Sequence, residues 1–369
     1  MSGLPRRLLL GSGPSPVPEA VLRALSQPTI GHLDPAFAEV MERCKGRLRE
    51  VFRTANDVTL PISGTGSAGM EAMVVNLVRP GDRVVCGVAG LFGERMADEL
   101  ARNGAEVVRV EGEWGRAVEP ERLAGALDER CAALFVVHGE TSTGVRQPLD
   151  GLADACRAAD ALLLADCVTS LGGARLEIDA EGVDAAFSGT QKCLNCPPGL
   201  APLTLSERAV ARVRPGRSWY FDLTLLLGYW TDPAASGSAA RSYHHTAPIN
   251  LVYALDAALE LVLEEGLEAR WQRHVDAHER LRAALDQRGF ERLAPEGEAL
   301  ASLLCVRVPE GLDEAAVRRA LLLDHGVEVS GGLGPLAGRV WRVGVMGEGA
   351  RPEAQDRFLD ALDQELARA

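Results

Sequence analysis

The chain has 369 residues, of which 47% are hydrophobic and 25% are charged. Such a composition is typical of a folded globular protein, and the length is sufficient for two hydrophobic cores. Acidic residues outnumber basic ones by 52 to 39, and the net charge of −13 repels nucleic-acid phosphates and anionic membrane surfaces. Neither is an expected partner. No stretch approaches the roughly 20 apolar residues that cross a bilayer, and no signal-peptide core follows the N-terminus, so we predict a cytoplasmic protein.

The first part of the chain alternates short apolar runs with helical patterns. This alternation predicts an α/β domain whose largely parallel sheet is covered on both faces by helices. Ligand-binding residues of such sheets collect just past the carboxyl ends of the strands. The apolar runs cover residues 58–63, 83–88, 106–110, 133–137, 162–167, 185–188 and 200–205.

The pattern changes after Pro215, where aromatic-rich sequence leads to a Gly/Ser/Ala stretch at 234–240. A long helical pattern then runs from Ile249 to Glu265 and onward past Trp271. A second alternation follows it and predicts a smaller α/β unit that starts near Gly266. Its expected elements are a strand at 301–308, a helix at 313–325, strands at 327–330 and 340–345, and a helix at 352–366.

Only two of the 39 basic residues are lysines, Lys45 and Lys192. Arginine cannot replace a lysine that acts as a nucleophile, because guanidinium stays protonated while a desolvated ammonium can lose its proton. Lys45 lies on the polar side of an amphipathic helical pattern, and we expect an ordinary solvated charge there. Lys192 lies in no such pattern and is the candidate functional amine.

A glycine-rich turn follows the first apolar run of the sheet. The start of a helix after such a turn offers free backbone N–H groups and a favourable dipole to a phosphate. Gly64, Gly66 and Gly69 match a dinucleotide fingerprint, but the next strand ends without the acidic residue that would hold a ribose. A single phosphate, held with the help of the Thr65 and Ser67 hydroxyls, fits better. The alternative is a turn that merely connects strand and helix.

Asp166 directly follows the apolar run 161–165, so its carboxylate should lie at the end of a buried strand and needs a cationic partner. Lys192 follows the run 185–188 and the turn 189–191, and both residues can open into one cleft. One interpretation is a salt bridge between the two. The other is a pyridoxal 5'-phosphate site, in which Lys192 forms the aldimine, Asp166 stabilises the protonated pyridine nitrogen and the Thr65 turn holds the phosphate.

The eight cysteines do not form a disulfide framework in a chain of this size. Cys193 and Cys196 form a Cys-x-x-Cys, yet no second pair or histidine stands at metal-binding spacing, and two prolines follow where a redox motif would begin a helix. His244 and His245 have no nearby carboxylate in sequence to orient them as ligands, so we expect ordinary hydrogen bonds. No metal site is predicted.

Six segments resemble, in the same order along nearly the whole chain, the alanine:glyoxylate and serine:pyruvate aminotransferases of class V. The resemblance implies the α/β fold of the fold-type I pyridoxal phosphate-dependent transferases, with a mainly parallel seven-stranded sheet in a large domain and a smaller C-terminal α/β domain. It also implies an N-terminal arm at 1–20, a large domain at 21–265 and a small domain at 266–369. The segments are 63–66, 138–144, 163–166, 188–192, 243–246 and 331–334.

The resemblance assigns contacts at the phosphate and the substituents of the cofactor ring. Thr65, Gly66 and Gln191 would hold the phosphate, and Thr141 would touch the ring oxygen or neighbouring atoms. Ser67 stands where some relatives have histidine, so the phosphate contacts would differ slightly there.

Val168 and Phe92 would cover the two faces of the ring. Phe92 replaces a tryptophan of close relatives, which keeps the stacking but loses the indole N–H. Tyr243 and Thr246 would reach the phosphate in the neighbouring subunit, which implies a homodimer with sites shared between the subunits.

The resemblance also places the substrate. Arg342 would bind the α-carboxylate through a bidentate fork. The turn at 11–15, with Gly13 in its centre, and the segment at 31–35 would close over the substrate and leave room for little more than a methyl or hydroxymethyl group.

The leading hypothesis is a transaminase that moves the amino group of L-alanine or L-serine to glyoxylate or pyruvate, with Lys192 also shuttling the α-proton. A sulfur-transferring lyase is disfavoured, because Cys305 lies in a strand pattern and Cys193 and Cys196 are too close to the lysine to swing freely. A 2-aminoethylphosphonate or ureidoglycine aminotransferase stays open. A non-catalytic regulatory protein is the remaining alternative, against which the retained lysine argues.

Overall fold

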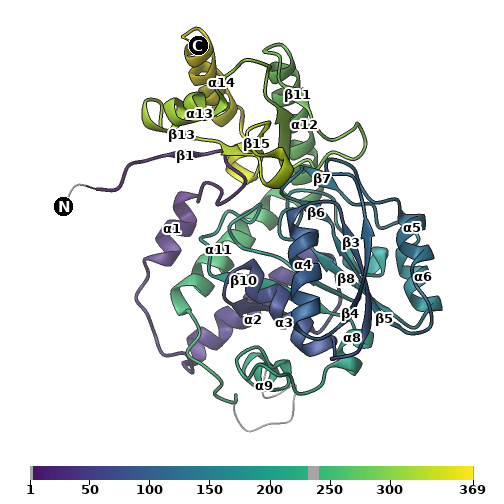
Figure 1. The fold of residues 1–369 in the computed structure, drawn as a ribbon. Helices are drawn as coiled ribbons and strands as arrows, with labels where there is room; N and C mark the ends of the chain where they lie inside the picture. The colour runs from purple at the N-terminus through teal and green to yellow at the C-terminus, as the bar shows by residue number, and fades with distance from the viewer. Residues whose placement is uncertain (1–2, 232–240, 369) are drawn as a thin grey trace.

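The computed structural model describes residues 3–231 and 241–368 (Figure 1). The Gly/Ser/Ala stretch expected at 234–240 lies outside the described residues. None of the described helices is both long and apolar enough to cross a membrane.

A seven-stranded sheet forms the centre of the large domain, with the strand order β2-β10-β9-β8-β5-β3-β4. Five neighbouring strands, from β9 to β4, run parallel, while β10 is antiparallel to both β2 and β9. The predicted mainly parallel sheet is therefore confirmed. The strands are β2 (Val58–Ser63), β3 (Arg83–Val88), β4 (Glu106–Glu111), β5 (Cys131–Val137), β8 (Leu162–Asp166), β9 (Ala185–Phe187) and β10 (Leu200–Leu205).

Helices cover both faces of this sheet, as continuous apolar strands require. Figure 1 shows α3 and α4 on one side and α5 and α6 on the other. The described helices of this domain are α1 (Glu19–Leu25), α2 (Pro35–Phe52), α3 (Gly66–Leu77), α4 (Leu91–Arg102), α5 (Pro120–Gly125), α6 (Leu152–Ala158), α7 (Ile178–Glu181), α8 (Glu207–Arg212), α9 (Leu223–Trp230) and α11 (Ile249–Glu265). A short hairpin, β6 (Gly139–Glu140) and β7 (Val145–Arg146), follows β5.

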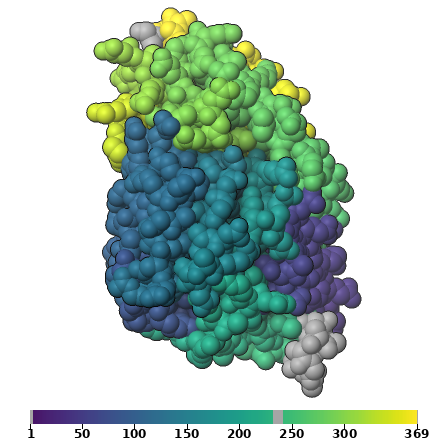
Figure 2. Space-filling view, turned by 90° about the vertical axis from the view of Figure 1, so that its right-hand side faces the viewer, coloured from purple at the N-terminus to yellow at the C-terminus, as the bar shows by residue number. Residues whose placement is uncertain are grey.

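The small domain is built on a four-stranded sheet with the order β11-β12-β15-β14. Its strands are β11 (Glu291–Arg292), β12 (Leu303–Arg307), β14 (Ser330–Gly331) and β15 (Val340–Gly344), and its helices are α12 (Leu267–Asp286), α13 (Glu314–Leu323) and α14 (Pro352–Leu366). Figure 2 shows this domain, in green and yellow, packed on the end of the large one. The smaller C-terminal α/β domain is confirmed, while the boundaries at 20 and 265 stay predictions.

Two details of the predicted elements are wrong. The helix expected to continue from Ile249 past Trp271 is interrupted at Gly266, whose φ of +81° lies in the region that favours glycine, so α11 and α12 are separate helices. The strand expected at 327–330 is divided into β13 (Val327–Glu328) and β14, and the two parts pair with different partners. β13 pairs in parallel with β1 (Leu8–Leu9), which ties the beginning of the chain to the small domain.

The prediction of a solvated Lys45 is also wrong. Lys45 is only 6% exposed, and its amine donates hydrogen bonds to the carboxylate of Glu42 at 3.0 Å and to the backbone carbonyl of Trp230 at 2.9 Å. The end of α9 covers this side of α2. A helical pattern identifies a polar face but not what packs on it, and here the polar face is held by a partner 185 residues away.

Candidate active site

A cavity of about 220 Å³ lies at the carboxyl ends of the central strands. Its position agrees with the rule that ligands of parallel sheets bind just past these ends. All but three of its lining residues, Met70, Arg95 and Phe187, are predicted site residues. The lining consists of Thr65, Gly66, Ser67, Met70, Phe92, Arg95, Thr141, Asp166, Val168, Phe187, Gln191 and Lys192.

The turn between β2 and α3 forms one end of the cavity. Thr65 is the N-cap residue of α3, yet its hydroxyl makes no capping hydrogen bond, so it is available to a ligand. The first N–H groups of a helix have no partner within the helix and point past its start. Gly64 has a φ of +142°, and a Cβ atom there would lie 2.4 Å from the Cβ of Ala68. Only glycine therefore fits at this turn, which can present N–H groups and the Thr65 hydroxyl to an anion.

Asp166 ends β8 and is 3% exposed. One carboxylate oxygen accepts a hydrogen bond from the backbone N–H of Val168 at 2.8 Å. Burial raises the pKa of Asp166 to about 7, the Val168 hydrogen bond opposes this rise, and the nearby Glu140 adds to it. Asp166 forms no ion pair within the described residues, and a cationic group placed beside this buried carboxyl would be held strongly.

Lys192 enters the same cavity from the loop after β9, and it is 8% exposed. Its amine donates a hydrogen bond to the backbone carbonyl of Ser12. Within residues 3–231 and 241–368 it forms no salt bridge with Asp166, so the alternative of an internal ion pair is wrong. Burial lowers the pKa of Lys192 to about 8, while Cys193 and Asp166 raise it and Arg342 lowers it further. Near neutral pH, a usable fraction of this amine is uncharged.

Gly13 lies directly against the amine, although it does not line the cavity. Its φ is +110°, and a Cβ atom at this position would lie 2.5 Å from the amine nitrogen of Lys192. Ser15 fixes the same turn, because its N–H donates to the carbonyl of Gln191 at 2.9 Å and its hydroxyl donates to the carbonyl of Lys192 at 2.6 Å. The N-terminal segment thus covers the lysine loop.

Phe92 and Val168 line the cavity together, as the resemblance implies for the two faces of a ring. The start of α4 is fixed by Glu140, whose carboxylate accepts from the N–H groups of Phe92 at 3.1 Å and Gly93 at 3.2 Å. The guanidinium of Arg95 lies 4.8 Å from the centre of the Phe92 ring. Arg95 is not among the predicted site residues, although its position three residues after Phe92 in a helical pattern places both on one face.

Arg342 lies beyond Thr141, outside the lining of the cavity. Its guanidinium donates to the carbonyl of Gly331 at 2.8 Å and to that of Thr141 at 3.3 Å, and the residue is 6% exposed. These two carbonyls fix the orientation of the Arg342 guanidinium without neutralising its charge. The hydroxyl of Thr141 pairs with that of Thr169, which holds the segment beside β8.

Tyr243 and Thr246 are not brought into the cavity of this chain. Both are exposed, Tyr243 by 63%. His245, between them, shares a hydrogen bond of 2.7 Å with the hydroxyl of Ser63, and His244 stacks on Trp219 with ring centres 4.4 Å apart. The segment 243–246 therefore contacts the turn after β2 through His245, while Tyr243 and Thr246 lie at the surface.

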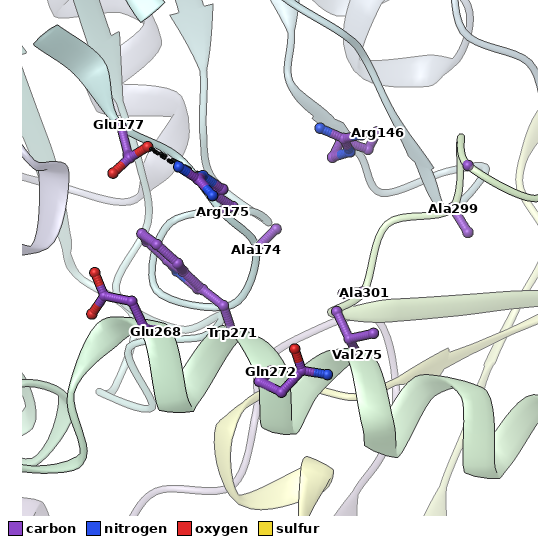
Figure 3. Close-up of a pocket in the computed structure, with 11 residues that line it drawn as sticks. Arg146, Ala174, Arg175, Glu177, Glu268, Trp271, Gln272, Val275, Ala299 and Ala301 are labelled. Atoms are coloured by element: carbon purple, nitrogen blue, oxygen red, sulfur yellow. Dashed lines mark hydrogen bonds and ion pairs between the residues drawn. The ribbon is translucent and has the colours of Figure 1, made fainter. Parts of the chain in front are cut away.

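A second cavity, of about 550 Å³, lies between α12 and the loops at 174–177 and 297–301 (Figure 3). It contains Arg146, Trp271 and an ion pair of 2.7 Å between Arg175 and Glu177. None of the predicted site residues lines it. Of these two cavities, the smaller one contains the buried amine and the buried carboxyl.

In the part of the chain that the structure describes, the remaining reactive groups do not form a metal centre. Cys193 and Cys196 are buried, unpaired thiols whose pKa values are raised by burial, to about 11 for Cys193. Within the described ranges, no group of three or more His, Cys, Asp or Glu side chains is arranged to hold a metal ion.

Comparison with known proteins identifies the family. The model of the family "Aminotransferase class-V" matches residues 7–337. A (S)-ureidoglycine–glyoxylate transaminase of Bacillus subtilis is 37% identical over 99% of this chain and 91% of its own. The crystal structure of an alanine–glyoxylate aminotransferase from Nostoc is 47% identical, with a TM-score of 0.94 over 99% of this chain and 96% of that one. An aspartate aminotransferase from Thermus thermophilus is 36% identical, with a TM-score of 0.87 over 96% of this chain and 99% of that one.

These relatives share the fold described above over nearly its whole length. Enzymes of this family use pyridoxal phosphate as their cofactor. The chain therefore belongs to the class-V aminotransferase family, and it is an aminotransferase of fold type I.

Proposed function

We propose that the 220 Å³ cavity binds pyridoxal 5'-phosphate at Lys192, and that the protein transfers the amino group of L-alanine or L-serine to glyoxylate or pyruvate. The observation that carries the proposal is the arrangement of Asp166 and Lys192. Both line one cavity, both are buried, and the amine is bound to a backbone carbonyl rather than to the carboxylate. The amine of Lys192 is thus left for the carbonyl of the cofactor, and the carboxylate of Asp166 is left for the nitrogen of the cofactor ring.

The cavity wall suits the cofactor at each end. The Thr65 turn supplies a free hydroxyl and the start of α3 for a phosphate, with Gly66 and Ser67 beside it. Gln191 lines the cavity as well, and the N–H groups of its side-chain amide can donate to a phosphate oxygen. The carboxyl of Asp166 favours a cationic nitrogen, and Phe92 offers a stacking surface.

When bound, pyridoxal phosphate supplies an electron sink for the pair of electrons left when the α-proton of an amino acid departs. Asp166 would hold the ring nitrogen in its protonated form, which keeps that sink strong. Lys192 would hold the cofactor and, once released from it, would move the proton from the α-carbon. Its lowered pKa suits this role, because a base must be partly uncharged at the working pH.

Arg342 would bind the substrate carboxylate, and this contact selects amino and oxo acids without choosing their side chain. The size limit comes from the N-terminal segment. Gly13 lies against Lys192, where a Cβ atom would collide with the amine. This close approach supports a small side chain, as in alanine and serine. The loop at 31–35, whose His32 carbonyl accepts from the hydroxyl of Tyr229 at 3.0 Å, would close over the substrate as the resemblance implies.

The second candidate donor is ureidoglycine, because a transaminase named for it is 37% identical over nearly the whole chain. Glyoxylate is the acceptor that this relative shares by name with the Nostoc enzyme. An acidic donor is the third arm of the test, since the Thermus relative is named an aspartate aminotransferase.

The test is a panel of donors, L-alanine, L-serine, ureidoglycine, L-aspartate, L-glutamate and 2-aminoethylphosphonate, each with glyoxylate, pyruvate and 2-oxoglutarate. Initial rates are measured and products identified. We expect the highest kcat/KM for alanine or serine with glyoxylate or pyruvate. A preference for any other donor would replace the substrate assignment, and reduction with borohydride followed by peptide mapping would test the cofactor separately.

We further propose that the active form is a homodimer in the cytoplasm. Exposed apolar side chains gather on the segments around Tyr243, and covering them would remove unfavourable surface from water. They include Leu33, Trp219, Tyr220 and Leu225, each at least 39% exposed. Tyr243 and Thr246, exposed on the same segments, would complete the phosphate site of the partner. Eight unpaired thiols suit a reducing compartment.

A further inference from the structure

Arg270, in the first turn of α12, is a buried arginine with four acceptors. It is 4% exposed. Its guanidinium donates to the backbone carbonyl of Gly172 at 3.0 Å, to that of Cys193 at 2.6 Å, to the side-chain oxygen of Asn195 at 3.0 Å and to Glu265 at 2.6 Å. Cys193 and Asn195 belong to the loop that carries Lys192, whereas Gly172 belongs to the segment that follows Asp166. One rigid fork therefore joins the two segments that supply the amine and the carboxyl.

Asn195 extends these contacts to the lysine itself. It has a positive φ of 53°, and its amide donates to the hydroxyl of Ser15 at 3.0 Å and to the carbonyls of Pro16 at 2.9 Å and Met346 at 3.3 Å. The Ser15 hydroxyl donates in turn to the carbonyl of Lys192 at 2.6 Å. Gly347 faces Asn195 so closely that a Cβ atom there would overlap the Asn195 side chain. The backbone of Lys192 is thus fixed from both sides of the loop.

We propose that Arg270 is a positioning residue, which holds the Lys192 loop against the Asp166 segment and fixes both relative to the small domain. The inference rests on the proposed role of Lys192. Arg270 touches neither the cavity nor any reacting atom. It acts through the backbone at Cys193, directly after the lysine, and through Asn195.

Arg273, one turn later on α12, provides a matched control. It binds the same carboxylate, Glu265, at 2.5 and 2.9 Å, and its remaining contact is the carbonyl of Gly347 at 2.8 Å. Both arginines therefore share an acid and a helix at the junction of the two domains, while only Arg270 reaches the lysine loop. The next residue after Arg270, Trp271, lines the cavity of Figure 3.

We call the hydrogen bonds of Arg270 to Gly172, Cys193 and Asn195 the clamp. Loss of this clamp has a specific chemical consequence. Burial is the main reason for the low pKa of Lys192, and the charged or titratable groups that act on it are Cys193, Arg342 and Asp166. A loosened loop lets water reach the amine, which restores its pKa toward the ordinary value. A purely structural contribution of Arg270 to the domain junction would lower stability without moving this pKa.

The experiment follows the acylation of the two lysines in the cofactor-free, full-length protein at a series of pH values. Acetic anhydride is the probe, and peptide mass spectrometry gives the rate at each lysine. Lys45 serves as an internal reference in the same molecule, because it lies against Glu42 and Trp230, away from the clamp. In Arg270→Gln we expect the midpoint of the Lys192 profile to rise by about one pH unit. In Arg273→Gln it should stay where it is in the unchanged protein.

Arg270→Lys guards against a variant that does not fold. It keeps the charge beside Glu265 but cannot reach all the acceptors of the fork, and we expect an upward shift of the midpoint here too. Thermal unfolding identifies the folded variants. An unshifted Lys192 profile in a folded Arg270 variant, or an equal shift in Arg273→Gln, would overturn the proposal. Because the labelling involves no cofactor, it succeeds or fails independently of the borohydride test.

Discussion

The amine of Lys192 is hydrogen-bonded to the backbone carbonyl of Ser12, although 180 residues separate the two in the chain. A neutral carbonyl stabilises an ammonium less than a carboxylate does, so the amine keeps its low pKa and the carboxyl of Asp166 stays without a cation. The arm of the protein thereby keeps two opposite charges apart within one cavity.

Lys192→Arg should remove covalent attachment of pyridoxal phosphate and leave the fold intact. Guanidinium stays protonated and cannot attack the cofactor carbonyl. The measurement is borohydride reduction of the purified protein followed by peptide mapping. In the unchanged protein the label should be on Lys192, and Lys45→Arg, the control, should keep it. A label on Lys45 would contradict the assignment of Lys192 as the residue that binds the cofactor covalently.

Asp166→Asn should lower the rate of the half-reaction with L-alanine by about 10²-fold or more, because the neutral amide cannot keep the ring nitrogen protonated. Stopped-flow absorbance of the cofactor follows this step directly. The side chains have nearly the same shape, so the circular dichroism spectrum should be unchanged. A rate close to that of the unchanged protein would refute the role of Asp166.

The same substitution should change how stability depends on pH in the cofactor-free protein. The carboxyl of Asp166 holds its proton up to a pH of about 7 in the folded state but loses it near its ordinary value of 3.8 in the unfolded chain. Between these values the folded state binds more protons, so this group lowers the free energy of unfolding as the pH rises. Asparagine has no carboxyl to titrate, so the free energy of unfolding of Asp166→Asn lacks this decrease.

Urea unfolding of both proteins at several pH values between about 4 and 7 provides the measurement. We expect Asp166→Asn to gain stability relative to the unchanged protein as the pH rises. A constant difference across this range would show that Asp166 is not buried with a raised pKa.

Complementation between inactive variants tests the shared site. Lys192→Ala lacks the amine, and a variant with both Tyr243→Phe and Thr246→Ala lacks the side chains offered to the partner. A mixed dimer contains one site in which both sets are present, so mixing should restore part of the activity. Subunit exchange is monitored by native mass spectrometry. Exchange without any return of activity would exclude a contribution from the partner.

Lys45→Met should destabilise the protein by about 1–3 kcal/mol, since it leaves the buried carbonyl of Trp230 without a donor. Activity per folded molecule should be unchanged. Arg102→Ala is the control, because Arg102 pairs with Asp98 at the surface and such pairs contribute little. Equal losses in the two variants, measured by urea unfolding, would show that burial of Lys45 adds nothing.

The sequence was sufficient for the sheet and for most of the cavity, because both depend on local signals. Apolar runs identify strands, and the rule that sites form at strand ends brings Thr65, Asp166 and Lys192 to one edge. The glycine turn at Gly64 and Gly66 indicates where α3 begins. The resemblance to a family then added Phe92, Thr141 and Val168, which periodicity alone does not distinguish.

Features that depend on distant contacts escaped prediction. Lys45 is on a polar helix face, but that face is covered by residues that follow far along the chain. Nothing in the sequence distinguishes Arg270 from an ordinary surface arginine, because only the fold brings it to Cys193 and Gly172. The absence of a salt bridge between Asp166 and Lys192 depends on Ser12, whose carbonyl no sequence pattern identifies as an acceptor.

The pairing of β1 with β13 has a consequence for the order of synthesis. A ribosome releases Leu8 and Leu9 long before their partners, Val327 and Glu328, because the whole large domain lies between the two strands in the chain. Ser12 lies three residues after β1, so the β1 side of the turn that offers the acceptor for Lys192 is anchored only after the small domain exists. A nascent chain that stops before Val327 contains the lysine, the aspartate and the glycine turn, yet lacks the strand that anchors the arm over them.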